Sequence, residues 1–540
     1  MLEGLSVQLA LASLATVSLS SLPVGYQLVV LNAPQRLLER FLNASMRREH
    51  ELSLKSPLSL SATWSFIVVC QPIGALIGCF AILPLLRRLG RRFCLMLLSN
   101  LLLLLGSLLM ASSKLANSFE ILVVGRLLIG ISNGVVMASL PIWINEVSPL
   151  RWRGPLCCLQ NSFIVLGGAV AACLGMEWVL GNEAAWPYLL ACPLLPALLQ
   201  LGLFLLLPET PKFLLVECED PEAAIHSIRF YHGSGADCRA VAEQLELESR
   251  EEAKGAQMTL SDALCYPKYR RRIMLGGLVS FAHVFAGAAV LMAYSTELLR
   301  RLELPKDQAQ VVTAGGGLVS ALFSLPAVCL VERVGRRPLL LGSLALVCLL
   351  LLFLFVFSLL VRFVHVSWAV YSTVALVLLL FCAFHLGMGP LAYFLTVELA
   401  ASPARAPSQG GFLLGFFYAI AVAVYWLSAI LAGFLFYPLM RVVGAFAFLL
   451  FLLPSLFNLW LLTWKLPETR AEGQQQHQVP ASSTTPTMKS VAGADDSPLQ
   501  RKSNSATVPA AVPPTAAAAQ RVEAKEEELK GLSLFWGLGL

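Results

Sequence analysis

Twelve long apolar stretches constrain this chain more than any other feature of its sequence. A helix of about 20 mostly apolar residues is the element that crosses the hydrocarbon core of a bilayer. With 57% hydrophobic and only 13% charged residues, the chain does not have the composition of an ordinary soluble protein. We therefore predict an all-α membrane protein with twelve transmembrane helices. The stretches occupy residues 6–31, 62–86, 93–113, 119–143, 155–180, 186–207, 273–298, 309–331, 338–361, 367–395, 410–435 and 439–465.

Positive charge in the short loops predicts how these helices are oriented. Short loops that carry an excess of Lys and Arg face the cytosol. The loops after the second, fourth and eighth stretches hold Arg87, Arg88, Arg91, Arg92, Arg151, Arg153, Arg333, Arg336 and Arg337. These loops and both termini are therefore predicted to be cytosolic. Because loop arginines account for much of the net charge of +6, we do not infer nucleic-acid binding from it.

The loop between the first two stretches is predicted to lie outside the cell. It contains the sequon Asn43-Ala44-Ser45, which can be glycosylated only in a lumenal or extracellular position. The same loop also carries five basic residues, which argue for the opposite side. We interpret Asn43 as a glycosylation site and the chain as a multi-pass protein of the plasma membrane.

Composition divides the chain into four parts. Residues 1–207 and 273–466 hold six apolar stretches each and are predicted to form two six-helix bundles. Residues 208–272 are polar with helical spacing, which predicts a cytosolic loop of short helices. Residues 467–540 are rich in Pro, Ser, Thr, Ala and Gln, which predicts a disordered cytosolic tail.

Three motifs recur in the same order in the two halves. Gly90-Arg91-Arg92 recurs as Gly335-Arg336-Arg337, and Pro208-Glu209-Thr210 recurs as Pro467-Glu468-Thr469. Between them, an acid seven residues before an arginine occurs in both halves. Matching landmarks at equivalent helix ends indicate duplication of a six-helix unit.

The repeated charges predict one cluster at the cytosolic end of each half, because acids at helix ends can pair with arginines of a neighbouring loop. Such clusters could hold the two halves together at the inner face. In the alternative interpretation, the arginines only fix the topology. The predicted clusters are Arg91, Arg92, Glu146 and Arg153 in the first half, and Arg336, Arg337, Glu398 and Arg405 in the second.

Together with further motifs, these features resemble the facilitative glucose transporter family, in the sugar porter branch of the major facilitator superfamily. The further motifs are Gly25-Tyr26, Asn32-Ala33-Pro34-Gln35, Gly125-Arg126, the run from Glu146 to Gly154, Pro211 after Thr210, and Glu332-Arg333. The entry to helix 2, from Pro57-Leu58 to Trp64-Ser65, is similar to the fructose-transporter subgroup. The resemblance covers about residues 20 to 470. It implies the major facilitator superfamily fold, with twelve helices in two six-helix bundles around a central site.

The resemblance also implies a function: uniport of a hexose or related polyol by alternating access, in a lipid bilayer, without cofactor and without enzyme activity. A proton-driven carrier needs a titratable group at membrane depth, and the chain has neither Asp nor Glu between Leu5 and Leu38. Two alternatives are a carrier of a less hydroxylated or anionic small molecule such as urate, and a non-transporting receptor or scaffold.

Few of the family's hydrogen-bonding residues are retained at the positions to which the resemblance assigns substrate binding. These positions carry Asn161, His283, Ser320, His385 and Tyr393, with Tyr294 as an outer-gate tyrosine and Phe416 and Phe417 in helix 11. We predict that His283 and His385 face each other across the cavity as hydrogen-bonding groups; alternatively, each bonds a backbone carbonyl. Other amides in the spans could line the cavity, but we expect them to bond helix to helix: Gln27, Gln71, Asn133 and Gln160.

Overall fold

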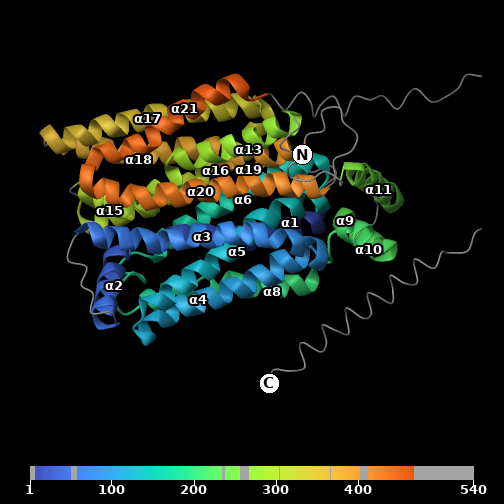
Figure 1. The fold of residues 1–540 in the computed structure, drawn as a ribbon, viewed down its shortest axis with the longest axis horizontal. Coiled ribbons are helices and arrows are strands. Elements are labelled where there is room, and N and C mark those ends of the chain that lie inside the picture. The colour runs from blue at the N-terminus through green and yellow to red at the C-terminus, as the bar shows by residue number, and fades with distance from the viewer. Residues whose placement is uncertain are drawn as a thin grey trace, which may run out of the picture. The chain divides into compact units, whose positions relative to one another are not determined.

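The computed structural model consists of helices that run side by side along one direction (Figure 1). It describes residues 6–49, 57–233, 237–255, 267–302, 304–364, 367–401 and 411–467, which belong to one compact unit, Met1–Val479. Within these ranges the chain forms helices and no strand. Arg405 and the tail beyond Pro467 lie outside the described residues.

The N-terminal half contains six membrane-length spans, some of them built from two consecutive helices. A further helix, α2, lies between the first and second spans. The helices are α1 (Val7–Val29), α2 (Gln35–Glu49), α3 (Pro57–Leu89), the π-helical turn η1 (Phe93–Leu98), α4 (Ser99–Ala116), α5 (Phe119–Val147), α6 (Leu150–Leu174), α7 (Trp186–Ala191) and α8 (Leu194–Leu206).

The C-terminal half repeats this arrangement with more interruptions. Gly287, with φ of +83°, separates two helices of its first span, in a backbone conformation that glycine adopts without a Cβ penalty. The helices are α13 (Pro267–Phe285), α14 (Ala288–Ala293), α15 (Ser295–Arg301), α16 (Lys306–Val334), α17 (Arg336–Val364), α18 (Ser367–Leu386), α19 (Met388–Ala401), α20 (Gly411–Val443), the 3₁₀ turn η2 (Gly444–Phe448) and α21 (Leu449–Lys465).

The number of spans depends on how the last apolar stretch is divided. By length and hydropathy the described residues contain eleven candidate spans, and the last one, Phe417–Lys465, has 49 residues. At about 1.5 Å per residue this stretch is more than twice the thickness of the hydrocarbon core, so it crosses twice. The chain turns at Gly444, where φ is +63°. The predicted break at residues 435–439 was therefore placed too early, because α20 continues to Val443.

Three short helices occupy the segment between the halves: α9 (Pro211–Val216), α10 (Pro221–His232) and α11 (Cys238–Gly255). The carboxylate of Asp220 accepts a hydrogen bond from the Ala223 N–H at the start of α10 and so caps this helix. We call the end of the bundle that carries α9–α11 the inner end, and the end that carries α2 the outer end (Figure 1).

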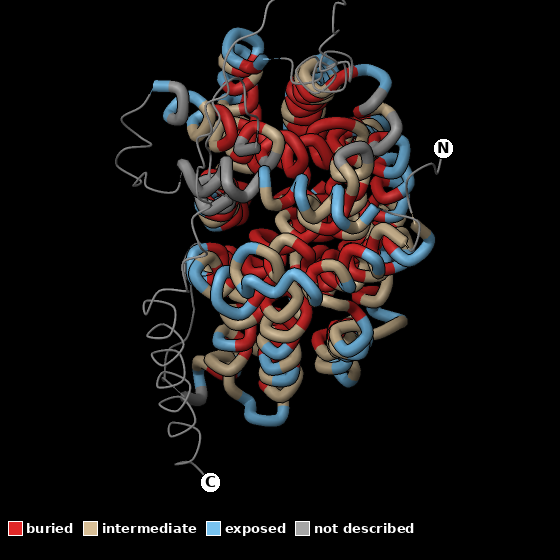
Figure 2. Tube along the Cα trace, turned by 90° about the vertical axis from the view of Figure 1, so that its right-hand side faces the viewer, coloured by how far each residue is buried: buried red, intermediate tan, exposed pale blue. Residues whose placement is uncertain are grey.

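Figure 2 shows the bundle with its inner end facing the reader: buried segments fill the interior and exposed segments lie mainly at the rim. Small residues allow helices to approach closely in this interior. A Cβ built on Gly78 of α3 would lie 2.2 Å from the carbonyl oxygen of Ile131 in α5, so only glycine fits there. Large apolar side chains on the outer faces suit contact with lipid, among them Leu105, Leu108, Leu195, Leu199, Phe323 and Phe353.

Candidate functional site

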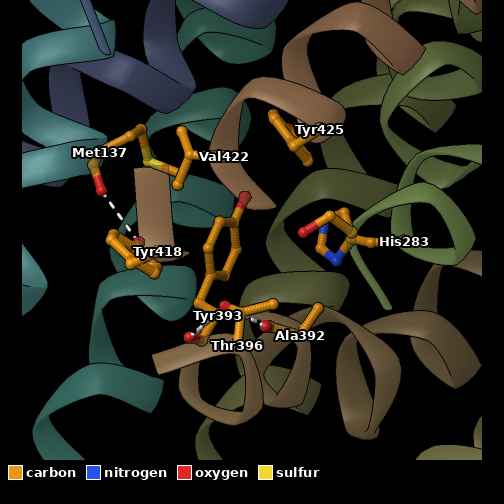
Figure 3. A pocket seen from close by; sticks show the side chains of 9 residues that line it. Met137, His283, Ala392, Tyr393, Thr396, Tyr418, Val422 and Tyr425 are labelled. Carbon is orange, nitrogen blue, oxygen red and sulfur yellow. Dashed lines mark hydrogen bonds between the residues drawn. The ribbon is translucent and has the colours of Figure 1, made fainter. Parts of the chain in front are cut away.

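A small pocket lies between the two halves and is dominated by aromatic side chains (Figure 3). Its cavity has a volume of about 10 Å³, which is room for about one water molecule, so the pocket is nearly closed in this conformation. Helices α5, α13, α19 and α20 supply its lining. The lining residues are Met137, Ser280, His283, Ala392, Tyr393, Thr396, Tyr418, Val422 and Tyr425.

His283 is the central polar group of this pocket. It is 3% exposed, and its ring centroid lies 4.9 Å from that of Phe384, 5.2 Å from Tyr393 and 5.5 Å from Tyr425. The rings meet at steep angles of 59–69°, as edge-to-face aromatic contacts do. The pocket therefore offers ring faces and edges, with hydroxyl groups from the tyrosines and Thr396.

The inner side of the pocket is bridged by a hydrogen bond between the halves. The hydroxyl of Tyr418 in α20 donates to the carbonyl oxygen of Met137 in α5, at 2.9 Å (Figure 3). Because Met137 lies ten residues before the inner end of α5, this bond lies on the side of the pocket toward the inner ends of the helices.

The outer end is closed by a larger set of contacts between the halves. Asn32, after α1, donates to the Met292 carbonyl and to the Ser295 hydroxyl, both at 2.9 Å. Arg36 of α2 forms an ion pair of 3.0 Å with Glu297 of α15. The hydrogen bond that Arg36 donates to the Glu297 carboxylate raises the pKa of Arg36, which keeps its guanidinium charged.

The sequence-predicted substrate residues fall into two groups. His283 and Tyr393 line the pocket, and the hydroxyl of Tyr294 donates to the Gly433 carbonyl at 3.2 Å, toward the outer closure. In contrast, the Ser320 hydroxyl donates to the Gly316 carbonyl of its own helix. Nδ1 of His385 lies 2.8 Å from the Phe381 carbonyl one turn earlier, and His385 is not part of the pocket lining.

Asn161 of α6 is buried and approaches α19. A Cβ built on Gly389 would lie 3.2 Å from its Nδ2. The structure thus brings Asn161 close to the helix that carries Tyr393, although Asn161 is not part of the pocket lining.

Sequence reasoning missed most of the lining from α20. Phe416 and Phe417 were expected there, but Tyr418, Val422 and Tyr425 line the pocket. Phe417 is buried, and nothing is described for the side chain of Phe416. The three lining residues are spaced four and three residues apart, which places them on one face of the helix. Sequence does not reveal which face of α20 lines the pocket, because the helix is apolar on every face.

At the inner end of the first half, Arg91 and Glu146 form an ion pair of 2.9 Å whose side chains are 12% and 8% exposed. Glu209, which we had not assigned to the cluster, accepts hydrogen bonds from the backbone N–H groups of Arg91 and Arg92. The Thr210 hydroxyl donates to Glu146 at 2.7 Å. The repeated Pro-Glu-Thr motif is thus part of this cluster. Arg153 donates to the Ser148 carbonyl.

Burial raises the pKa of the Glu209 carboxyl, and hydrogen bonds from the backbone N–H groups of Arg92 and Thr210 partly offset that rise. Two of its three backbone N–H partners, Arg91 and Arg92, lie just before η1, so Glu209 satisfies donors at the start of this span.

In the second half, Arg336 and Glu398 lie 3.6 Å apart, and Arg337 donates to the Thr463 carbonyl at 2.8 Å. Arg405, the fourth predicted member, is outside the described residues. Both ion pairs join helices of the same half, α3–η1 with α5 in the first and α17 with α19 in the second.

The predicted glycosylation site lies within α2. Asn43 is half-buried, and the hydroxyl of Ser45 in the same sequon donates to the Asn117 carbonyl at 2.9 Å. This contact ties α2 to the segment between α4 and α5.

Comparison with known proteins gives a consistent result. Residues 13–478 match the family model described as sugar (and other) transporter. The chain is 30% identical over 453 residues to solute carrier family 2, facilitated glucose transporter member 1 of Gallus gallus, covering 84% of this chain and 89% of that protein. It is 32% identical over 462 residues to member 3 of Ovis aries, covering 85% and 89%.

Among solved structures, the chain is similar to the xylose transporter XylE from E. coli in a partially occluded inward-open conformation. The TM-score is 0.68 at 21% identity, covering 86% of this chain and 99% of that one. The major facilitator superfamily proton:xylose symporter XylE bound to 6-bromo-6-deoxy-D-glucose gives a TM-score of 0.70 at 21% identity, covering 85% and 96%. At this identity the likeness concerns the fold alone.

Proposed function

Because the chain belongs to the sugar (and other) transporter family, we propose that it carries a hexose or related polyol across a membrane by facilitated diffusion. The observation that carries the proposal is the match to the family over residues 13–478, which spans both halves. The relatives named facilitated glucose transporters support the substrate class.

The predicted fold class is confirmed: the chain has the major facilitator superfamily fold, with twelve helices in two bundles. In this fold, transport proceeds by rocking the two halves about a central site. The contacts that must break are those between the halves. At the outer end they include the ion pair between Arg36 and Glu297. On the inner side of the pocket they include the hydrogen bond from Tyr418 to Met137.

The sequence supports uniport. Among the residues of the first span there is neither Asp nor Glu, and Arg126 of α5 donates instead to the backbone carbonyl of Gln27, at 2.8 Å. Without a titratable acid at this depth, α1 offers no group that could take up and release a proton during each cycle.

The chain is an integral multi-pass membrane protein. For its placement we propose the plasma membrane, with both termini in the cytosol, on the basis of the arginine-rich loops at the inner end. The predicted latch was meant to hold the two halves together, but the Arg91–Glu146 and Arg336–Glu398 pairs each join helices of one half. In these positions the pairs would stiffen the inner ends on which the halves rock.

Uptake into liposomes that contain the purified full-length chain tests the function. Labelled glucose, fructose and urate are compared, each with and without an inward proton gradient, and protein-free liposomes give the background. We expect saturable uptake of a hexose that equilibrates and does not respond to the gradient. Accumulation above equilibrium under the gradient would contradict uniport, uptake of urate alone would replace the substrate class, and no uptake of any of the three would overturn the proposal.

A further inference from the structure

Four buried amides in the N-terminal half lack hydrogen-bond partners for their side-chain nitrogens, within the described part of the chain: Gln27 of α1, Gln71 of α3, Asn133 of α5 and Asn161 of α6. They are between 0% and 3% exposed. The side-chain oxygens of Gln27 and Gln71 have no partner there either. The expectation that Gln27, Gln71 and Asn133 bond helix to helix therefore does not describe this structure. Three of the four, Gln27, Asn133 and Asn161, belong to helices α1, α5 and α6.

These amides differ from another buried amide in the same half. Gln200 of α8 is 1% exposed and donates to the Ser20 hydroxyl at 2.5 Å. The bundle can therefore satisfy an amide where the amide serves packing. A buried polar group without a partner costs about 1–3 kcal/mol, so unpartnered amides point to a ligand.

Asn133 lies next to the pocket along α5. Arg126, Asn133 and Met137 are separated by seven and four residues, which places them on one face of the helix. Met137 lines the pocket. Asn133 is therefore one turn from the pocket, on the side toward the outer end.

Gln27 and Asn161 lie at a similar depth in the bundle to this face of α5. Arg126 donates to the backbone carbonyl of Gln27 at 2.8 Å, which joins α1 to α5. A Cβ built on Gly25 would lie 1.7 Å from the Ile164 carbonyl oxygen, so α1 and α6 touch there, two and three residues from Gln27 and Asn161. The amides thus lie between the pocket and the outer closure.

The two halves present different chemistry to a substrate. On the C-terminal side the pocket offers the rings of His283, Tyr393 and Tyr425. On the N-terminal side the amides offer both donors and acceptors, which match hydroxyl groups that also donate and accept. A pyranose has an edge of hydroxyls and faces of C–H groups, so it fits between such surfaces.

We propose that Gln27 and Asn133 bind substrate hydroxyls beside Asn161, which the family resemblance already assigns to substrate binding, and that a bound monosaccharide turns its hydroxyl edge toward these amides and a C–H face toward His283, Tyr393 and Tyr425. This inference rests on the proposed sugar transport. It assigns recognition of hydroxyls to the N-terminal half, and in particular to Gln27 and Asn133.

Two variants and a matched control test the assignment in the full-length chain. Asn133→Leu and Gln27→Leu remove the unpartnered amides and keep the volume. Gln200→Leu removes an amide that has a partner. For Asn133→Leu and Gln27→Leu we expect the KM for glucose to rise about threefold to tenfold while the thermal midpoint stays level or rises. For Gln200→Leu we expect a lower midpoint and an unchanged KM.

Monodeoxy glucoses identify the contact. If Asn133 binds one hydroxyl, the analogue that lacks it should show the same KM in wild type and Asn133→Leu, whereas the other analogues keep the penalty. An unchanged glucose KM in both amide variants would overturn the inference while leaving sugar transport intact. A penalty that is equal for all the deoxy analogues would assign the amides to structure and likewise overturn it. Absence of sugar uptake by the wild type would instead overturn the proposed function, and this inference with it.

Discussion

Glu39 of α2 accepts a hydrogen bond of 2.8 Å from the hydroxyl of Tyr437 in α20, so the two halves meet through a buried carboxylate at the outer end. Arg441 donates to the same hydroxyl at 2.7 Å and lies 3.7 Å from the carboxylate. The ring of Tyr437 stacks on Tyr294, with centroids 5.3 Å apart and planes 4° apart. The contacts among Glu39, Arg441 and Tyr437 therefore link the outer closure to Tyr294, which lies on the outer side of the pocket.

Tyr437→Phe should weaken the outer closure, because it removes the hydroxyl but keeps the stacked ring. The loss is about 1 kcal/mol, or roughly fivefold in the equilibrium between closed and open outer ends. Spin labels on the exposed positions Arg40 of α2 and Gln308 of α16, in a background without native cysteines, should report a larger population of long distances. Tyr371→Phe, at a 68% exposed position, is the control. Identical distance distributions in wild type and Tyr437→Phe would show that the hydroxyl does not hold the closure.

The two inner ion pairs should contribute unequally to stability. Glu146→Gln breaks a close, buried pair with Arg91, at a cost of about 3–5 kcal/mol. Glu398→Gln weakens a pair that is 3.6 Å long and more exposed, at a cost of about 1 kcal/mol. Thermal unfolding of the purified variants measures both, with Glu222→Gln on the exposed start of α10 as the control. A larger loss from Glu398→Gln than from Glu146→Gln would contradict this ranking.

Close packing of α3 on α5 makes Gly78 intolerant of any side chain. In Gly78→Ala the new Cβ would lie 2.2 Å from the Ile131 carbonyl, so the helices must separate. We expect a loss of about 1–3 kcal/mol, read as reduced yield of monodisperse protein and a lower thermal midpoint. Gly342→Ala in α17, where a Cβ meets nothing within 4 Å, should be neutral or stabilising. Equal behaviour of the two variants would remove the steric argument.

The fold was largely predictable because bilayer thickness sets the length of each span. Errors remained where a local turn, and not hydropathy, ends a helix. In the apolar run from Phe417 to Lys465 the single charge of Arg441 is too little to mark the turn, and the chain reverses at Gly444, where φ is positive. The inner ion pair between Arg91 and Glu146 could be predicted because an internal repeat placed an acid and a base at adjoining helix ends.

The lining of the pocket was less predictable, because α20 is apolar on every face and its rotation is set by packing. Tyr418 and Tyr425 face the pocket and Phe417 is not part of its lining, yet all three are aromatic. Sequence also could not distinguish Gln200, which has a partner in Ser20, from Gln27, whose side chain has none. That distinction depends on which hydroxyls of neighbouring helices lie within reach.

Glu209 should make stability depend on pH at the inner end. Its folded pKa lies above its ordinary value of 4.5, so the folded protein binds this proton more tightly than the unfolded chain does. Its contribution to stability is therefore largest at low pH and is lost as pH rises through the folded pKa. Glu209→Gln removes this dependence. The thermal midpoint of the variant, relative to that of the wild type, should therefore rise from pH 5 to pH 8. A constant difference between the two proteins across this range would contradict the assignment.

The two intramembrane histidines should respond differently to substitution, because only His283 lines the pocket. His283→Ala removes a ring that contacts Tyr393 and Tyr425, and we expect the KM for the transported sugar to rise about tenfold. His385 lies against the carbonyl of Phe381 in its own helix, so His385→Ala should leave KM unchanged and alter only stability. Uptake kinetics of both variants at matched protein density measure the difference. If the histidines instead face each other across the site, as their sequence positions first indicated, the two substitutions will raise KM together and the double variant will add little to either.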